Sequence, residues 1–319
     1  MHTRLLAAAL LLWGGAQLPA LAQQEAHFTQ WDLDKLNLNA AYAGVKGRPT
    51  ASVASRMQWV GFEGAPATQA ARFHMPLLYG RAGVGAALEH DAIGSSRSTQ
   101  LKLAYAYRIE LGGGTMLGLG LEGQLRQVRI DYSEARVNDL DPIAGAGVSN
   151  RLLPNVGAGV YLYGEGYYVG ASVSRLARST PFVPDGLTER RGFTEEVPHA
   201  YLMAGLDVEV QPDWRLRPGL LLKYASTVPV SADANAVLMY RERFGGGLAL
   251  RGGWTKGLGP RATAAAVIGR VALGEEGILG LSYDLELSEV ASGTVGGLEL
   301  VYEHRWGSER RGGIPCPWH

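Results

Sequence analysis

The stretch LKLAYAYRI at residues 101–109 decides the fold class. Its odd-numbered positions carry large apolar or aromatic side chains, whereas its even-numbered positions carry Lys102, Ala104, Ala106 and Arg108. Successive side chains of a β-strand point to opposite faces of a sheet. The alternation therefore predicts a strand with one apolar face and one face of small or charged residues, and it shows no helical period.

The same alternation recurs along the chain, for example at 202–210 and 279–287 and in the last segment before Trp306. Each run holds about ten residues, the length that a tilted strand needs to cross a membrane. We predict about 14 strands, near 50–59, 68–76, 82–90, 98–110, 114–127, 155–163, 166–174, 198–210, 214–224, 234–242, 245–253, 261–273, 277–287 and 294–306.

Short and long connections alternate between these predicted strands. A soluble β-sandwich also has alternating strands, but outer-membrane barrels combine them with short periplasmic turns and longer extracellular loops. We therefore predict an all-β fold, a transmembrane antiparallel β-barrel with both chain ends on the periplasmic side. The short connections are 111–114, 164–166, 211–213, 243–244 and 274–277, and the longest are 128–153 and 175–197.

The N-terminus predicts export. Arg4 precedes the apolar run 5–13, which is too short to span a bilayer as a helix, and Ala20-Leu21-Ala22 has the small-x-small pattern of a signal-peptidase site. We predict a signal peptide at 1–22 with cleavage after Ala22. A lipoprotein would need cysteine at the next position, which is Gln23.

Glycine is over-represented, with 44 of 319 residues, about twice its usual share. Many glycines lie inside alternating segments, where they would leave room in the lumen of a barrel. Residues 23–47 alternate poorly, and we expect them to fold into that lumen as an N-terminal hatch. The barrel would then span 48–306, followed by a tail at 307–319 with the single cysteine, Cys316, so no internal disulfide is expected.

No catalytic, metal or cofactor site is predicted. Lysine plus arginine and aspartate plus glutamate balance at 30 each, so no net charge favours nucleic acid. Gly118-x-Gly120-x-x-Gly123 resembles a dinucleotide fingerprint only in spelling, because it lies in an alternating strand and not before a helix. The histidines lack metal-ligand spacing. We expect no enzyme; a hydrolase within the barrel would require a serine that fluorophosphonate probes label.

The densest aromatic and polar stretch is RMQWVGFEGAPATQ at 56–69, with a turn through Gly64 and Pro66. It can be an aromatic belt at the membrane interface or a recognition rim, and residue types alone favour the belt. As a hypothesis, Trp59 and Phe62 form the mouth, and Arg56 and Gln58 hold the turn from the lumen side. The partner-binding candidates are Arg56, Gln58, Trp59, Phe62 and Pro66.

A series of motifs resembles the PorP/SprF outer-membrane proteins of the type IX secretion system, over nearly the whole mature chain. The chain departs from the family at Ala40 and Gly219, where proline and serine are usual. The matching motifs are Phe28-Thr29-Gln30, Asn39-Ala40-Ala41-Tyr42-Ala43-Gly44, Gln58-Trp59-Val60-Gly61-Phe62, Asp91-x-Ile93-Gly94, Tyr105-Ala106-Tyr107-Arg108, Leu153-Pro154-Asn155, Tyr168-Val169-Gly170, Pro218-x-Leu220-Leu221-Leu222-Lys223-Tyr224 and Arg243-Phe244.

The resemblance implies an outer-membrane protein that delivers or anchors secreted cargo at the cell surface, in some members adhesins for gliding. The implied partners are cargo with a type IX C-terminal targeting domain, other components of that system and membrane lipid, but no nucleic acid. The alternative is a channel for hydrophobic small solutes, similar to the long-chain fatty-acid transporters. Solute uptake in liposomes would favour the channel, and recovery of a cargo domain with the barrel would favour the secretion role.

Overall fold

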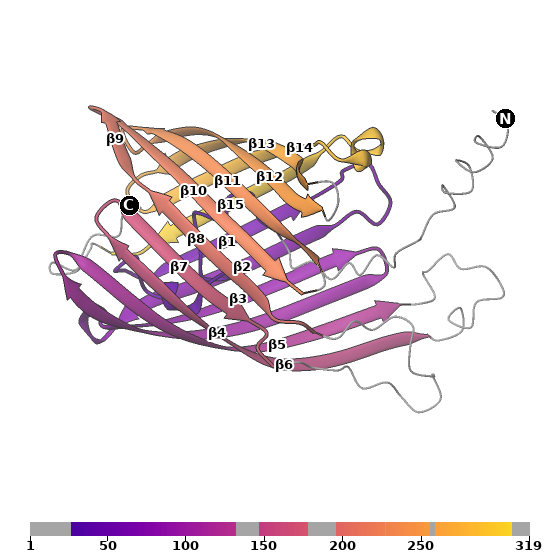
Figure 1. Ribbon diagram of the computed structural model, residues 1–319, viewed down its shortest axis with the longest axis horizontal. Coiled ribbons are helices and arrows are strands. Elements are labelled where there is room, and N and C mark those ends of the chain that lie inside the picture. Colours follow the sequence, from indigo (N-terminus) through magenta and orange to yellow (C-terminus); the bar gives the residue numbers. More distant parts are fainter. Residues whose placement is uncertain (1–26, 132–146, 178–195, 227, 256–258, 308–319) are drawn as a thin grey trace, which may run out of the picture.

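A computed structural model describes residues 27–131, 147–177, 196–226, 228–255 and 259–307, and nearly all of them belong to one sheet (Figure 1). The predicted signal peptide and Cys316 lie outside the described residues. The strands are β1 (Thr50–Met57), β2 (Ala67–Leu77), β3 (Ala82–Ile93), β4 (Ser96–Gly112), β5 (Thr115–Asp131), β6 (Val148–Gly164), β7 (Tyr167–Ser174), β8 (His199–Leu206), β9 (Val208–Gln211), β10 (Trp214–Ala225), β11 (Val228–Tyr240), β12 (Phe244–Thr255), β13 (Gly259–Leu273), β14 (Gly277–Glu286) and β15 (Gly297–Arg305).

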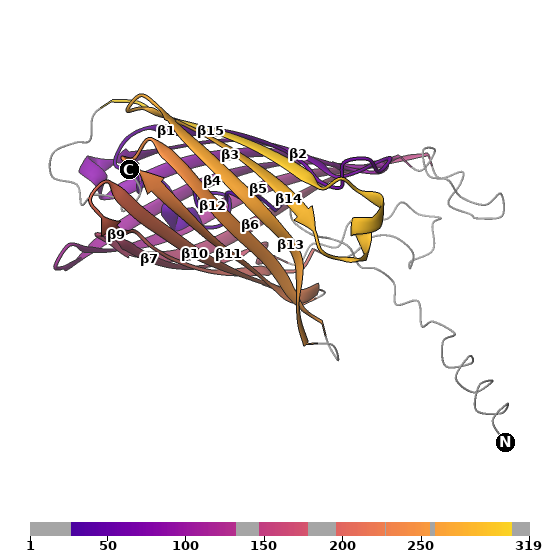
Figure 2. The ribbon, with the colours of Figure 1, turned by 90° about the horizontal axis from the view of Figure 1, so that it is seen from above.

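The sheet closes on itself as a barrel, with its strands tilted around a common axis (Figures 1 and 2). Apart from β8 and β9, consecutive strands pair antiparallel, and β1 pairs with β15 from Thr50↔Arg305 to Met57↔Leu298. β8 and β9 both pair with β10 and are interrupted only at Asp207, so they form one strand of the ring. The result is a closed 14-stranded barrel, which confirms the predicted fold class.

The described helices are three short 3-10 segments, η1 (Ala40–Tyr42), η2 (Leu78–Gly80) and η5 (Glu289–Gly293). None of them has the length and apolar character that a membrane-crossing helix requires.

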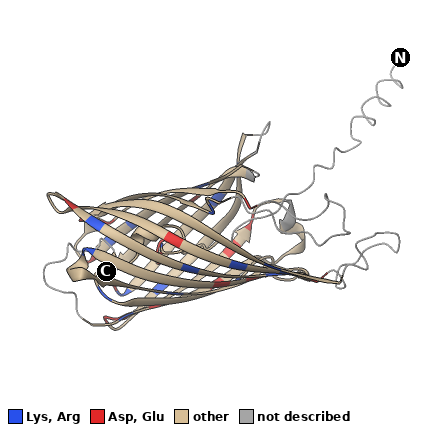
Figure 3. Ribbon diagram, turned by 90° about the horizontal axis from the view of Figure 1, so that it is seen from below, with Lys and Arg blue, Asp and Glu red and all other residues tan. Residues whose placement is uncertain are grey.

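The alternating faces follow the sequence pattern. In β4, Leu103 and Tyr105 are about half exposed on the outer face, at 59% and 48%, whereas Lys102 and Ala106 are buried on the inner face. Closure removes the free edges that an open sheet would expose to a solvent without hydrogen bonds, and the apolar outer face can meet lipid. Figure 3 shows charged residues at intervals along the strands, and buried ones such as Lys102 and Arg108 belong to the inner face.

The two ends of the barrel differ. We call the end with the connections after β1, β3, β5, β7, β10, β12 and β14 the loop end, and the opposite end the turn end. The predicted connection 128–153 is wrong at both margins, because β5 and β6 stay paired until Asp131↔Val148. Both strands reach 17 residues, longer than a membrane crossing needs, and they project beyond the other strands (Figure 1).

Residues 27–49, here called the N-terminal segment, lie inside the barrel. His27 is beside Lys223 near the loop end of β10, whereas Ala43 meets Arg108 near the turn end of β4. The segment thus runs down the lumen and then enters β1. Thr50 and Arg305 lie together at the turn end, and the chain termini themselves are outside the described residues. That the segment acts as a hatch stays a prediction.

Inward-facing glycines make room for this segment. An added Cβ at Gly120 would lie closer than 3.0 Å to the backbone of Ala40 and Ala41, and one at Gly83 would strike the carbonyl of Ala43. A side chain on the wall would therefore displace the segment. The lumenal glycines explain much of the unusual composition.

Two glycines of β5 provide a matched test. Gly120→Ala should lower the unfolding midpoint, since overpacking costs roughly 1–3 kcal/mol. Gly123→Ala on the outer face meets nothing within 4 Å and should leave the midpoint unchanged or slightly higher. The measurement is thermal unfolding of the purified barrel, followed by its gel mobility with and without boiling. Equal midpoints for the two variants would contradict close packing of the segment.

Candidate functional site

Ionic contacts hold the N-terminal segment to the barrel wall. The carboxylate of Asp32 accepts two hydrogen bonds from the guanidinium of Arg270 on β13, at 2.8 and 2.7 Å, and Lys46 pairs with Glu303 on β15. Burial opposes ionisation of Asp32, but the charge and hydrogen bonds of Arg270 outweigh it and keep the pKa of Asp32 below its ordinary value. A bidentate arginine–carboxylate pair fixes both distance and orientation.

A buried aromatic and apolar cluster fixes the turn-end half of the segment. Tyr42 packs edge-to-face on Tyr161, with ring centroids 5.5 Å apart. The side-chain amide of Asn39 donates to the carbonyl of Val160 at 2.9 Å, and its oxygen accepts from Ala41 N at the start of η1. Backbone groups that leave regular structure are therefore satisfied by the wall and by local caps.

Arg56 belongs to this interior network and not to the surface of the mouth. It is 2% exposed and donates to Thr29 Oγ1 at 2.8 Å, to Glu299 at 3.1 Å and to Asp284. Thr29 also donates its backbone N–H to Glu299 at 2.7 Å. Arg56 thus ties β1, β14, β15 and the segment together below the turn that it precedes.

The other candidate residues lie at the loop-end rim, which we define as residues 58–66 and 287–296. Gln58 N donates to Pro66 O at 2.9 Å and closes the connection after β1, and Pro66 is buried. Trp59 has a φ of 51°, a backbone region that is costly for side chains larger than glycine. Its indole N–H donates to Glu286 at 2.9 Å, which fixes the ring against the end of β14.

The two halves of the rim are bonded to each other. Val60 N donates to Gly296 O at 2.8 Å, and Val295 N donates to Val60 O at 3.0 Å. The ring of Phe62 lies against Gly293, where an added Cβ would come closer than 3.0 Å to it. Phe62 is still 43% exposed and Val295 is 66% exposed, so the rim presents apolar surface on a fixed backbone.

Sequence reasoning missed the second half of this rim and the charged contacts of the segment. Glycine and serine dominate 288–297 and indicate only a loop, so nothing marks it as the partner of residues 58–66. The acidic and basic residues of the segment were a usable signal, because Arg270 and Glu303 lie in the predicted strands 261–273 and 294–306. Those charges require partners in a lumen.

The described residues contain no group of three or more histidine, cysteine, aspartate or glutamate side chains that could hold a metal ion. The arrangement is suited to binding, since it offers a held interior segment and an apolar rim.

Comparison with known proteins gives one family and a set of similar folds. Residues 20–303 match the family described as Type IX secretion system membrane protein PorP/SprF. No curated protein sequence matches the chain. Among solved structures, the CymD monoaromatic hydrocarbon channel has a TM-score of 0.51 at 12% identity, covering 89% of this chain and 94% of its own. A Pseudomonas aeruginosa FadL homologue has a TM-score of 0.49 at 9% identity, covering 84% and 94%.

The closed sheet, its apolar outer face and the similar solved barrels define an outer-membrane β-barrel protein. Within that class, the chain belongs to the PorP/SprF family of type IX secretion system membrane proteins.

Proposed function

We propose that this barrel binds secreted cargo with a type IX C-terminal targeting domain and helps to deliver or anchor it at the cell surface. The observation that carries the proposal is the loop-end rim. Phe62 and Val295 remain exposed there, although backbone hydrogen bonds join the two halves of the rim. Rigid, exposed apolar side chains are the usual anchors of an interface, because little conformational entropy is lost on binding.

The strand direction supports an extracellular position for this rim. β1 begins at the turn end and outer-membrane barrels keep their short turns in the periplasm, so the connection after β1 is extracellular. The long connections after β5 and β7 leave the barrel at the same end. Other type IX components in the periplasm would meet the turn end.

Site-specific photocrosslinking in cells tests the location. A benzophenone amino acid at Phe62 should form an adduct with the client protein. The matched control is Tyr79, which is 95% exposed in the connection after β2 at the opposite end and should give no client adduct. Adducts from Tyr79 and none from Phe62 would place cargo at the periplasmic end and contradict the proposal.

An open channel for hydrophobic solutes receives less support from the lumen. The segment fills its turn-end half with the buried side chains of Leu36, Tyr42 and Val45. A solute could pass only if these residues moved. Uptake of such solutes by liposomes that contain the intact protein would favour the channel.

A further inference from the structure

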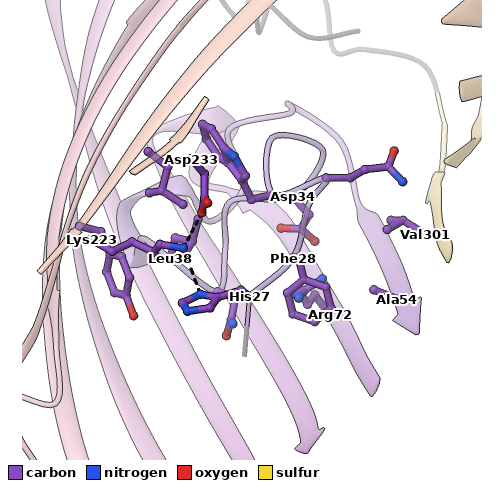
Figure 4. Close-up of a pocket in the computed structure, with 14 residues that line it drawn as sticks. His27, Phe28, Asp34, Leu38, Ala54, Arg72, Lys223, Asp233 and Val301 are labelled. Carbon is purple, nitrogen blue, oxygen red and sulfur yellow. Dashed lines mark hydrogen bonds and ion pairs between the residues drawn. The ribbon is translucent and has the colours of Figure 1, made fainter. Parts of the chain in front are cut away.

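A cavity lies in the lumen between the N-terminal segment and the wall (Figure 4). It holds about 550 Å³ of space that atoms do not occupy, including space open to solvent. Its apolar lining comes from both sides of the lumen and comprises Phe28, Trp31 and Leu38 of the segment with Ala54, Leu221 and Val301 of the wall.

One wall residue of this cavity is a buried arginine. Arg72 on β2 is 6% exposed and its Nε is buried without a hydrogen-bond partner. Its guanidinium forms no hydrogen bond or ion pair with the described residues, although its charge acts on the carboxylate of Asp34. Its guanidinium carbon lies 4.6 Å from the ring centroid of Phe28, and Figure 4 shows the two side chains together. Among the other buried arginines, Arg56 and Arg270 bond to carboxylates, and Arg108 donates to backbone carbonyls.

The nearby acid Asp34 attracts Arg72 by charge but is not hydrogen-bonded to it. Asp34 also lines the cavity, but its carboxylate accepts hydrogen bonds from Leu36 N at 2.9 Å and from Ser52 Oγ. Lys223, at another part of the lining, is paired with Asp233. Buried donors without an acceptor are costly, so the guanidinium of Arg72 can still take a hydrogen-bonding anion at this cavity wall.

Further donors of the lining are also unsatisfied within the described part of the chain. Trp31 Nε1 and Tyr201 OH are buried and have no hydrogen-bond partner there. Both groups can donate, as can Arg72. The cavity therefore combines donors that need an acceptor with apolar side chains that suit a hydrocarbon or aromatic body.

We propose that this cavity binds a small organic carboxylate with an apolar body, the carboxylate lying on Arg72 and the body against Trp31 and Leu221. The planar guanidinium fork matches two carboxylate oxygens. This site is separate from the rim and does not depend on cargo binding there.

Calorimetric titration of the detergent-solubilised full-length protein tests the site, with benzoate and hexanoate as probes and benzamide and hexanamide as uncharged controls. The carboxylates should bind at least tenfold more tightly than the amides. Arg72→Gln should lose roughly tenfold or more of that affinity, because it removes a charge-assisted hydrogen bond. Arg243→Gln, the same change at an exposed arginine in the connection after β11, should bind like the parent.

Thermal unfolding without ligand separates a binding arginine from a structural one. Arg72→Gln should unfold at the same temperature as the parent protein or a higher one, since an unpaired buried charge is removed, and benzoate should raise the midpoint of the parent only. A lowered midpoint for the empty variant would make Arg72 structural and overturn the proposal. The proposal would also be overturned if neither probe bound at millimolar concentration. The donors of Arg72, Trp31 and Tyr201 would then bind only water.

Discussion

Replacing Trp59 and Phe62 together with alanine should release the client protein into the medium while the barrel still assembles. Aromatic anchors at the centre of an interface each contribute about 2 kcal/mol or more. Phe62 is exposed on the rim and Trp59 is fixed by Glu286, so neither belongs to the membrane-spanning sheet. The measurement is client protein in cells and medium, beside the gel mobility of the unboiled barrel.

Two single variants sharpen this result. Trp59→Phe keeps the aromatic ring but loses the hydrogen bond to Glu286, and it should retain most of the client. Tyr79→Ala removes an exposed aromatic from the opposite end and should change nothing. If the double variant assembles and the client stays on the cell surface, the motif is only an interfacial belt.

Deleting residues 27–47 should change the barrel from low to high single-channel conductance. A 14-stranded barrel is wider than the eight-stranded kind that wall side chains can fill, so water would enter once the segment is gone. The segment now occupies the lumen with buried residues from Trp31 to Lys46. Equal conductance before and after deletion would show that the segment does not close the pore.

Charge reversal provides a gentler version of the same experiment. Arg270→Glu places a carboxylate beside Asp32 and should loosen the segment, giving intermediate or flickering conductance. Adding Asp32→Arg restores an opposite pair and should return the conductance to its low value. A double variant that conducts like Arg270→Glu alone would mean that this pair does not hold the segment.

The strands and their faces could be predicted because alternation reports directly on which side of a sheet each residue faces. The 101–109 pattern reappears in the exposures of β4 without a change of register. Strand ends could not be predicted, because the pairing of Asp131 with Val148 depends on a strand that lies across a connection. The first predicted strand, 50–59, stops at Met57 since Val60 turns to bond Gly296.

Part of the candidate site was placed from sequence and part was not. The position of the rim residues beside a turn follows from Gly64 and Pro66, and Phe62 is exposed there. The interior role of Arg56 does not follow, because its partners are Thr29, Asp284 and Glu299, far away in the sequence. Irregular backbone such as the N-terminal segment has no period that would predict its path.

The Arg56 network also has a consequence for the order of assembly. It joins Thr29 to Glu299, which are 270 residues apart, and it lies at the junction of the first and last strands. Contacts of such high sequence separation form late and slowly. Until β15 arrives, the wall is not sealed and the segment lacks its contacts with Glu299 and Glu303. A truncated chain without β15 therefore cannot close the barrel, because closure requires the pairing of β1 with β15.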